Sequence, residues 1–199
     1  MKLYGTPASR AMRSIWAAEE VGVDYEFIPT SFKDESKTPE YLAINPNGRV
    51  PALVDGDLEL FESMAINLYL AKTYGGKLYP SDAKDEARAI QWTIWGMTEL
   101  EPYLIPIFLH KMFLPEDERD PAVVANAETA VERPLAVLDA HVSDREYLLG
   151  GDFTIADLNL AGTLATASFA NFDISKFENA TRWLSRCTGR PSFARVREK

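Results

Sequence analysis

Residues 45–63 read NPNGRVPALVDGDLELFES and contain the clearest structural signals of the chain. Within this stretch, the apolar runs PALV and LELF flank an Asp-Gly-Asp sequence at residues 55–57. An Asp-Gly step between two apolar runs is a strong signal for a tight β-hairpin. The stretch therefore predicts two antiparallel strands, followed by a helix that begins at Glu62 or Ser63 and runs to Tyr74.

The residues before this hairpin predict two more strands and two more helices. Residues 2–5 and 25–28 are short apolar runs typical of strands, and residues 9–22 carry apolar side chains at helical spacing with a glycine at the end. A short helix is predicted over 38–44, because Pro39 suits a first helical turn. The order βαβαββα predicts an α/β domain around a four-stranded mixed sheet.

The sequence changes character near residue 80, and no convincing strand follows. The run GGKLYP at 75–80 is the best linker, so we predict domains over 1–78 and 85–199. The second domain is predicted to be all-helical. Its helices cover 90–112, which Pro102 and Pro106 should kink, then 124–142, 155–169 and 176–188, with a last short helix beginning at 189–191.

The composition of the chain is that of a soluble globular protein. Its 199 residues are 46% hydrophobic and 26% charged, and 30 acidic against 21 basic side chains give a net charge of −9. This acidic balance argues against binding to nucleic acid or to an anionic membrane. Because no signal peptide and no apolar run of about 18 residues is visible, we expect a cytoplasmic protein. One cysteine and two distant histidines argue against a disulfide framework and a metal centre.

Ser9 is the first candidate for a functional residue. It precedes the helix predicted over 9–22, where free backbone N–H groups and the helix dipole favour an anion. Its hydroxyl could therefore donate to a bound thiolate or phosphate. The simpler interpretation is a plain N-cap serine.

Two further segments could bind the ends of a peptide. Pro51 stands at the start of a strand inside the sheet, where a cis Val50–Pro51 bond would accommodate it and leave the Val50 backbone to pair with a peptide-like ligand. An ordinary trans turn proline is the alternative. Glu62 and Ser63 place a carboxylate and a hydroxyl at a helix start, where they could hold the ends of an α-amino acid or simply cap the helix.

Residues 153–158 predict a structural helix start. Thr154 has the position of an N-cap residue, and Asp157 lies where its carboxylate would reach back to the Thr154 N–H. Phe153 and Leu158 have the spacing of a hydrophobic staple. We therefore expect this motif to stabilise the helix and to make no contact with a ligand.

Taken together and in order, these segments resemble those of the cytosolic glutathione transferase family. The matching stretches are LYGTPAS at 3–9, NPNGRVPAL at 45–53, FESMAI at 61–66 and FTIAD at 153–157. The resemblance extends over the whole chain. It implies a thioredoxin-like N-terminal domain, an all-α C-terminal domain and a homodimer. It also implies a detoxification transferase that uses glutathione as cosubstrate, acts on a small electrophile and needs no metal.

The resemblance also implies roles for individual residues. Ser9 occupies the position of the activating serine of delta-, theta- and phi-like classes, whereas the beta class would carry a cysteine where this chain has Arg10. We therefore expect a serine-type member of bacterial type. Glutathione is expected to lie along Arg49, Val50, Pro51, Glu62 and Ser63, with Lys37 and Arg49 as candidates for its glycyl carboxylate. The wall for the electrophile is expected to include Trp95, Tyr103, Ile107 and Phe108.

Two other functions remain open at this stage. The same scaffold and the same Ser9 could serve a glutathione-dependent disulfide reductase or isomerase, although the absence of cysteine from the first domain disfavours a protein–glutathione disulfide. A non-catalytic binding or regulatory protein of the family is the other alternative.

Overall fold

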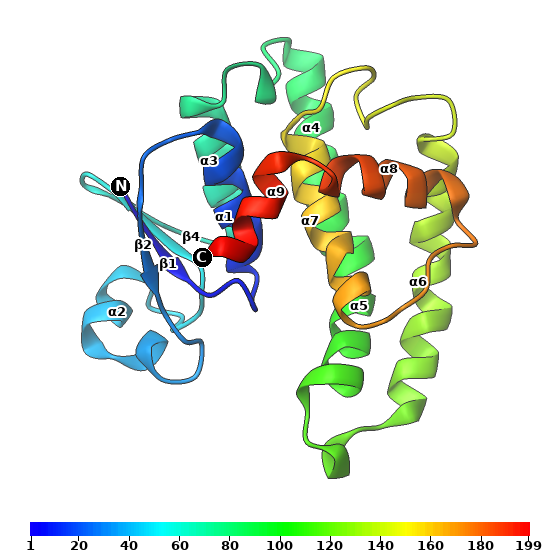
Figure 1. Cartoon of the computed structure of the whole chain (residues 1–199), viewed down its shortest axis with the longest axis horizontal. Helices are drawn as coiled ribbons and strands as arrows, with labels where there is room; N and C mark the ends of the chain where they lie inside the picture. The colour runs from blue at the N-terminus through cyan, green and yellow to red at the C-terminus, as the bar shows by residue number, and fades with distance from the viewer. The chain divides into compact units, whose positions relative to one another are not determined.

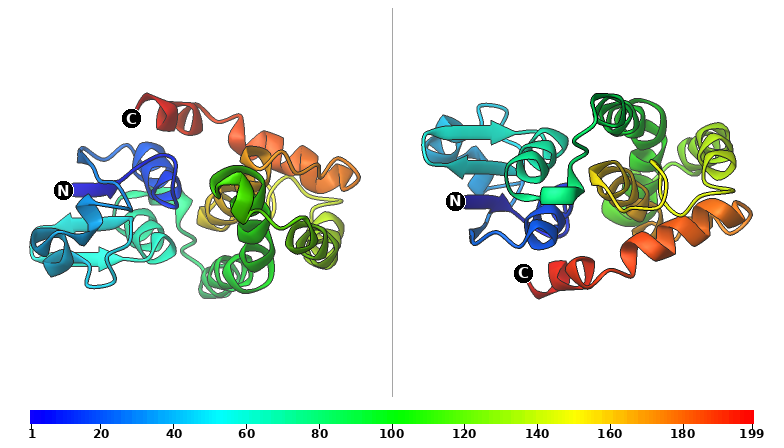
Figure 2. Two further views of the ribbon diagram at one scale, coloured as in Figure 1. Left: turned by 90° about the horizontal axis from the view of Figure 1, so that it is seen from below. Right: turned by 90° about the horizontal axis from the view of Figure 1, so that it is seen from above.

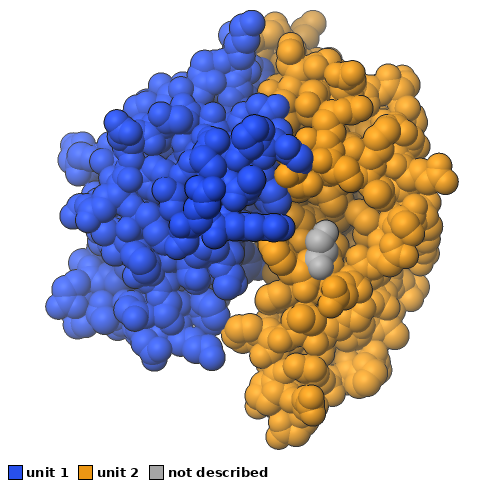
Figure 3. Space-filling view, in the orientation of Figure 1, with its two compact units in different colours: residues 1–81, 189–199 blue, residues 82–188 orange. Residues whose placement is uncertain are grey.

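The computed structural model describes residues 1–199, apart from the side chain of residue 168. The chain forms two compact units, which are coloured separately in Figure 3. Unit 1 comprises residues 1–81 and 189–199, and unit 2 comprises residues 82–188. Among the described residues, no helix has both the length and the apolar character that crossing a membrane requires.

Unit 1 is built on a four-stranded mixed sheet with the strand order β2-β1-β3-β4 (Figure 1). β1 pairs in parallel with β2 and antiparallel with β3, and β3 and β4 form the predicted hairpin. The strands are β1 (Lys2–Gly5), β2 (Glu26–Pro29), β3 (Ala52–Asp55) and β4 (Leu58–Phe61). The prediction of a thioredoxin-like βαβαββα domain is confirmed.

The two longest helices of unit 1 contact the sheet. α1 (Ala11–Val21) and α3 (Ser63–Tyr74) pack against each other and contact the sheet (Figure 2). Ile15 and Trp16 of α1 are completely buried. The remaining helical segments between β2 and unit 2 are η1 (Glu35–Lys37), α2 (Pro39–Ile44) and η2 (Gly76–Leu78).

The last residues of the chain also belong to unit 1. α9 (Pro191–Arg195) and η6 (Val196–Glu198) lie against α1, and Trp16 Nε1 donates to Ser192 Oγ at 3.1 Å. Nearby, Arg190 Nε donates to Glu20 at 3.0 Å. The predicted helical domain extended to residue 199. In the structure, residues 189–199 pack with unit 1 instead, because their polar and aromatic groups find partners on α1.

In the described part of unit 2 every named element is helical, and these helices are arranged around α7 (Figure 2). Residues 155–165 of α7 are all buried, and α7 contacts α4, α5 and α8, as its nearly uniform apolar character predicts. The helical segments of unit 2 are α4 (Ala83–Trp95), η3 (Gly96–Leu100), α5 (Glu101–Phe108), η4 (Leu109–Phe113), η5 (Glu116–Glu118), α6 (Pro121–His141), α7 (Ile155–Phe169) and α8 (Glu178–Thr188).

The helix predicted over 90–112 is not a regular α-helix. Two π-helical turns, η3 and η4, interrupt it, and the Glu101 N–H bonds the carbonyl of Gly96, five residues back. Pro102 has no N–H for a regular helical hydrogen bond, so a wider turn directly before it leaves fewer unmatched backbone groups. Pro102 and Pro106 correctly predicted an irregularity in this helix. We expected a kink, however, and the structure has two π turns.

Asp157 at the start of α7 is the polar anchor of unit 2. Its carboxylate accepts hydrogen bonds from the Thr154 N–H at 3.0 Å and the Thr154 hydroxyl at 3.0 Å. It also accepts from the Leu148 N–H at 2.8 Å and from Trp183 Nε1 at 2.9 Å. Burial raises the pKa of Asp157, whereas these four donors act in the opposite direction. The predicted bond to Thr154 is thus confirmed, and the structure adds two partners that are distant in sequence.

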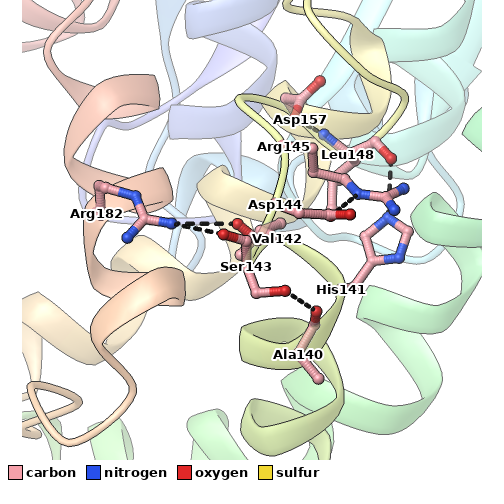
Figure 4. A network of polar contacts seen from close by, with 9 residues as sticks. All are labelled: Ala140, His141, Val142, Ser143, Asp144, Arg145, Leu148, Asp157 and Arg182. Carbon is pink, nitrogen blue, oxygen red and sulfur yellow. Dashed lines mark hydrogen bonds and ion pairs between the residues drawn. The ribbon is translucent and has the colours of Figure 1, made fainter.

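The loop between α6 and α7 is held by the same network (Figure 4). Arg182 reaches from α8 to the carbonyls of Val142 and Ser143, at 3.3 and 3.4 Å. On the other side of the loop, the Leu148 N–H donates to Asp157, and the Leu148 carbonyl accepts from His141 Nε2 at 2.8 Å. The loop is therefore fixed from three helices.

Replacing Asp157 should destabilise unit 2. Asp157→Ala leaves the buried Leu148 N–H and Trp183 Nε1 without an acceptor, and each unpaired buried donor costs about 1–3 kcal/mol. We expect a loss of about 3 kcal/mol in the free energy of unfolding, measured by urea denaturation. The exposed Asp152→Ala serves as the control and should change stability by less than about 0.5 kcal/mol. Equal stability of the two variants would contradict this role of Asp157.

Candidate functional site

The residues predicted to bind a ligand emerge at one end of the sheet in unit 1. Tyr4 of β1 lies opposite Ala52 of β3, and Ala52 lies opposite Phe61 of β4. The loop after β1, the residues before β3 and the residues after β4 therefore meet at the same end of three neighbouring strands. This register brings the segments around Ser9, Val50–Pro51 and Glu62–Ser63 together, although they are far apart in sequence.

Gly5 permits the close packing at this end of the sheet. Its φ of 155° lies in a region that side chains rarely adopt, and a Cβ added there would lie 2.3 Å from the Cβ of Ala11 and 3.8 Å from that of Val50. A side chain at this position would push the end of β1 away from the start of α1. The glycine thus allows strand, helix and binding edge to approach one another.

Ser9 lies half-buried, one residue before Arg10, which is the N-cap residue of α1. Its hydroxyl donates to the carbonyl of Thr6 at 2.8 Å, and its oxygen accepts from the Ala11 N–H at 3.1 Å. The interpretation of Ser9 as the N-cap residue is thus wrong by one position, but its hydroxyl oxygen does bond the first N–H of α1. Rotation about the Cβ–Oγ bond redirects the hydroxyl hydrogen at the cost of one hydrogen bond, about 0.5–1.5 kcal/mol. The hydrogen bond that Ser9 Oγ accepts from the Ala11 N–H also polarises the Ser9 hydroxyl and makes it a better donor.

The Val50–Pro51 peptide bond is cis, as predicted from the sequence. Pro51 is buried, Val50 is half-buried, and the side chain of Arg49 is exposed. The backbone of residues 49–51 thus enters β3 with Val50 at the rim of the sheet. Pro51 has no N–H, so Val50 supplies the backbone donor nearest to the start of β3.

Lys37 and Arg49 supply positive charge beside this edge. The Lys37 ammonium donates to the carbonyl of Gly48, one residue before Arg49. Arg49 makes no side-chain hydrogen bond or ion pair among the described residues, and its guanidinium is available to an anion. The structure therefore brings the two predicted basic residues to the same loop.

Glu62 has an unusual backbone conformation. It precedes α3 with φ 71° and ψ 114°, makes no side-chain hydrogen bond to the helix end, and is exposed. A non-glycine residue in such a conformation costs about 1–3 kcal/mol and is often found at functional sites. The next residue, Ser63, is buried, and its carbonyl accepts from the Ser14 hydroxyl of α1 at 3.4 Å. The starts of α1 and α3 are thereby connected.

The residues predicted for the electrophile wall lie in unit 2, and one of them is placed differently from the prediction. Ile107 is completely buried in the helical core, so its side chain is not accessible to a ligand. Trp95, Tyr103 and Phe108 are half-buried. The Trp95 ring packs edge-on against the Trp92 ring, with 5.1 Å between the ring centroids. Two cavities of unit 2, with volumes of about 370 and 390 Å³, are lined by other residues.

Two residues next to the site were not identified from the sequence. Tyr41 and Asn45 both donate to the carbonyl of Arg49. The Asn-Pro-Asn-Gly sequence does predict a turn in which Asn45 bonds the backbone two residues on, and its Oδ1 accepts from the Asn47 N–H at 3.1 Å. The role of Tyr41 has no comparable sequence signal, because it depends on where α2 packs.

Comparison with known proteins assigns both halves of the chain. Residues 1–72 match the family model of the glutathione S-transferase N-terminal domain, and residues 98–191 match that of its C-terminal domain. A glutathione S-transferase of Hyoscyamus muticus is 33% identical over 100% of this chain and 98% of its own length. Glutathione S-transferase 1 of Zea mays is 34% identical, over 98% of this chain and 95% of its own length.

The fold is also similar to that of solved structures. The theta class glutathione S-transferase from Xanthomonas axonopodis pv. citri, crystallised with glutathione bound, matches with a TM-score of 0.92 at 33% identity. The match covers 98% of this chain and 95% of that chain.

The backbone strain at Glu62 predicts that a glycine variant is more stable than an alanine variant at this position. Glu62→Gly and Glu62→Ala both remove the carboxylate, but only glycine adopts a positive φ without steric cost. We expect the Gly variant to be more stable than the Ala variant by about 1 kcal/mol in urea denaturation. The same pair of substitutions at Glu59, an exposed residue of β4, is the control and should show the opposite order, because glycine weakens a strand. The same order at both positions would contradict the strain.

Proposed function

The chain belongs to the glutathione S-transferase family, and on that premise we propose that unit 1 binds glutathione and holds its thiol as a thiolate at Ser9 for attack on an electrophile. The observation that carries the proposal is the register of Tyr4, Ala52 and Phe61. This register gathers the Ser9 hydroxyl beside a helix start, the backbone of Val50 and an acidic helix start at one end of one sheet. A tripeptide with charged ends fits such a combination of groups.

Each part of glutathione has a complementary group in this proposal. The Val50 backbone pairs with the cysteinyl residue at the edge beside Pro51. Glu62 and Ser63 hold the γ-glutamyl end, where the carboxylate of Glu62 suits the ligand's amino group and the helix start suits its carboxylate. Lys37 and Arg49 suit the glycyl carboxylate at the opposite end.

The energy needed to form the thiolate is modest. A free thiol has a pKa of about 8.5, so about 3% of it is ionised at pH 7. Lowering this pKa by about two units requires about 2.7 kcal/mol of preferential interaction with the anion. One hydrogen bond to a charged group contributes about 1.5–3 kcal/mol, and the helix dipole contributes about 0.3–1 kcal/mol. Ser9 and the start of α1 together reach the required amount.

Ser9 acts in this mechanism as a hydrogen-bond donor and keeps its own proton. The thiol proton leaves to water when glutathione binds, and the thiolate then attacks the electrophile. The new carbon–sulfur bond forms as the leaving group departs with its electron pair, or as the electron pair of an activated double bond moves onto an acceptor atom. Trp95, Tyr103 and Phe108 are the proposed apolar wall for the electrophile, because they combine large aromatic area with partial exposure.

Ser9→Ala tests the proposed chemistry. With glutathione bound, the wild-type protein should show thiolate absorbance at neutral pH, because the thiol pKa is lowered by about two units. Ser9→Ala should return this pKa toward the free value and slow conjugation of an activated aryl halide by about 10-fold to 100-fold. The affinity for glutathione should change little, because most proposed contacts lie at residues 49–51 and 62–63.

The matched control for Ser9→Ala is Ser143→Ala. The Ser143 hydroxyl donates to the carbonyl three residues before it, at 2.8 Å, as the Ser9 hydroxyl does. Both variants lose one such bond, and Ser9→Ala also loses the bond from the Ala11 N–H. If the two variants are similarly stable, loss of activity in Ser9→Ala alone separates catalysis from stability. A lowered thiol pKa that survives Ser9→Ala would contradict the role of Ser9. Glutathione binding without any pKa change or turnover would favour a non-catalytic member of the family.

We also propose that the protein is a cytoplasmic homodimer, as the family resemblance implies. Sedimentation equilibrium at micromolar concentration should give about twice the chain mass of 22.3 kDa. Repeating the measurement at lower protein concentrations should then give the dissociation constant of the dimer. A mass that stays at that of a single chain would contradict the dimer.

A further inference from the structure

The carbonyl oxygen of Arg49 accepts two side-chain hydrogen bonds. The Tyr41 hydroxyl donates to it at 2.7 Å, and the Asn45 amide nitrogen donates to it at 2.6 Å. Both donors are buried, with 4% and 2% exposure, whereas the side chain of Arg49 is exposed. We call this arrangement the carbonyl clasp. Since a carbonyl oxygen has two lone pairs, the clasp satisfies it completely.

The clasp controls the direction of the neighbouring N–H. The Arg49 carbonyl and the Val50 N–H belong to one planar peptide unit, and in a trans unit they point in opposite directions. The cis bond at this edge is the following one, between Val50 and Pro51. Fixing the Arg49 carbonyl from the interior therefore aims the Val50 N–H away from that interior, along the edge where a ligand would lie.

Each donor of the clasp is itself held in place. Asn45 Oδ1 accepts from the Asn47 N–H at 3.1 Å and from its side-chain amide at 3.0 Å, so the NH₂ of Asn45 faces Arg49. The Tyr41 ring packs edge-on against the ring of Tyr4 in β1, with 5.9 Å between the ring centroids. Burial raises the pKa of Tyr41 to about 12, which keeps its hydroxyl protonated as a donor at neutral pH.

The short helix α2 explains why two donors reach one carbonyl. Tyr41 lies within α2, and Asn45 directly follows it as the C-cap residue. Residues four apart lie on the same face of a helix, so both side chains point toward the loop that carries Arg49. Thr38, whose hydroxyl accepts from the Tyr41 N–H at 3.4 Å, begins this helix.

From this geometry we propose that Tyr41 and Asn45 are positioning residues for glutathione: by fixing the Arg49 carbonyl, they aim the Val50 N–H at the cysteinyl backbone of the ligand. The inference rests on the proposed function, because it needs glutathione at the Val50 edge. Neither residue touches the reacting sulfur. Their contribution is therefore to ground-state and transition-state binding alike, which alters KM and leaves kcat unchanged.

Tyr41→Phe is the decisive variant, because it removes one donor and keeps the buried ring. We expect its dissociation constant for glutathione, measured by calorimetry, to rise about three- to tenfold, which corresponds to one lost hydrogen bond. KM for glutathione should rise by the same factor, while kcat at saturating glutathione stays within about twofold of wild type. The melting temperature should fall by less than about 3 °C, since the packing is retained.

The matched control is Tyr25→Phe, which removes another phenolic hydroxyl of unit 1. Tyr25 donates to Glu19 at 2.8 Å, near the C-terminal residues and away from the binding loop. Tyr25→Phe should leave the affinity for glutathione unchanged.

Asn45→Ala provides a second test of the clasp and should raise KM for glutathione at least as much as Tyr41→Phe, again without a change in kcat. If Asn45→Ala fails to fold, the comparison of Tyr41→Phe with Tyr25→Phe still decides.

The outcomes separate this inference from the proposed function. If wild-type protein binds glutathione and Tyr41→Phe binds it equally well, the positioning role is wrong and the proposed function stands. A fall in kcat without a change in KM, or an equal loss of affinity in Tyr25→Phe, would also overturn the positioning role. If wild-type protein binds no glutathione at millimolar concentration, the proposed function fails and this inference fails with it.

Discussion

The close approach of β1 to α1 at Gly5 is the constraint on which the rest of the candidate site depends. A Cβ at this position would lie 2.3 Å from the Cβ of Ala11, so a side chain would separate the strand from the helix. The same packing keeps Val50 beside the end of β1. In the proposed function, the Ser9 loop and the edge at Val50 act on one small ligand, and a side chain at position 5 would move them apart.

Much of the proposed recognition uses backbone groups held by buried side chains. The Arg49 carbonyl is fixed by Tyr41 and Asn45, and the Ser63 carbonyl is bonded by Ser14. Such bonds are formed inside unit 1, where competition from water is small. The ligand then meets donors and acceptors whose directions are already set, which reduces the entropy lost on binding.

The helical unit uses buried polar anchors for a different purpose. Asp157 joins the start of α7 to the preceding loop through Leu148 and to α8 through Trp183. Because each partner would be costly to leave unpaired, the network defines one arrangement of these helices. The π turn before Pro102 likewise adapts the path of the helix, so that the proline does not interrupt the packing against α7.

Features that depend on neighbouring residues could be predicted from the sequence. The hairpin around residues 55–57, the start of α3, the cis Val50–Pro51 bond and the bond of Asp157 to Thr154 all follow from short motifs. Residues 189–199 joined unit 1, Ile107 became core, and Tyr41 reached Arg49 only in the tertiary structure. Such contacts depend on which surfaces pack together, and no local pattern encodes that choice because hydrophobic burial is non-directional.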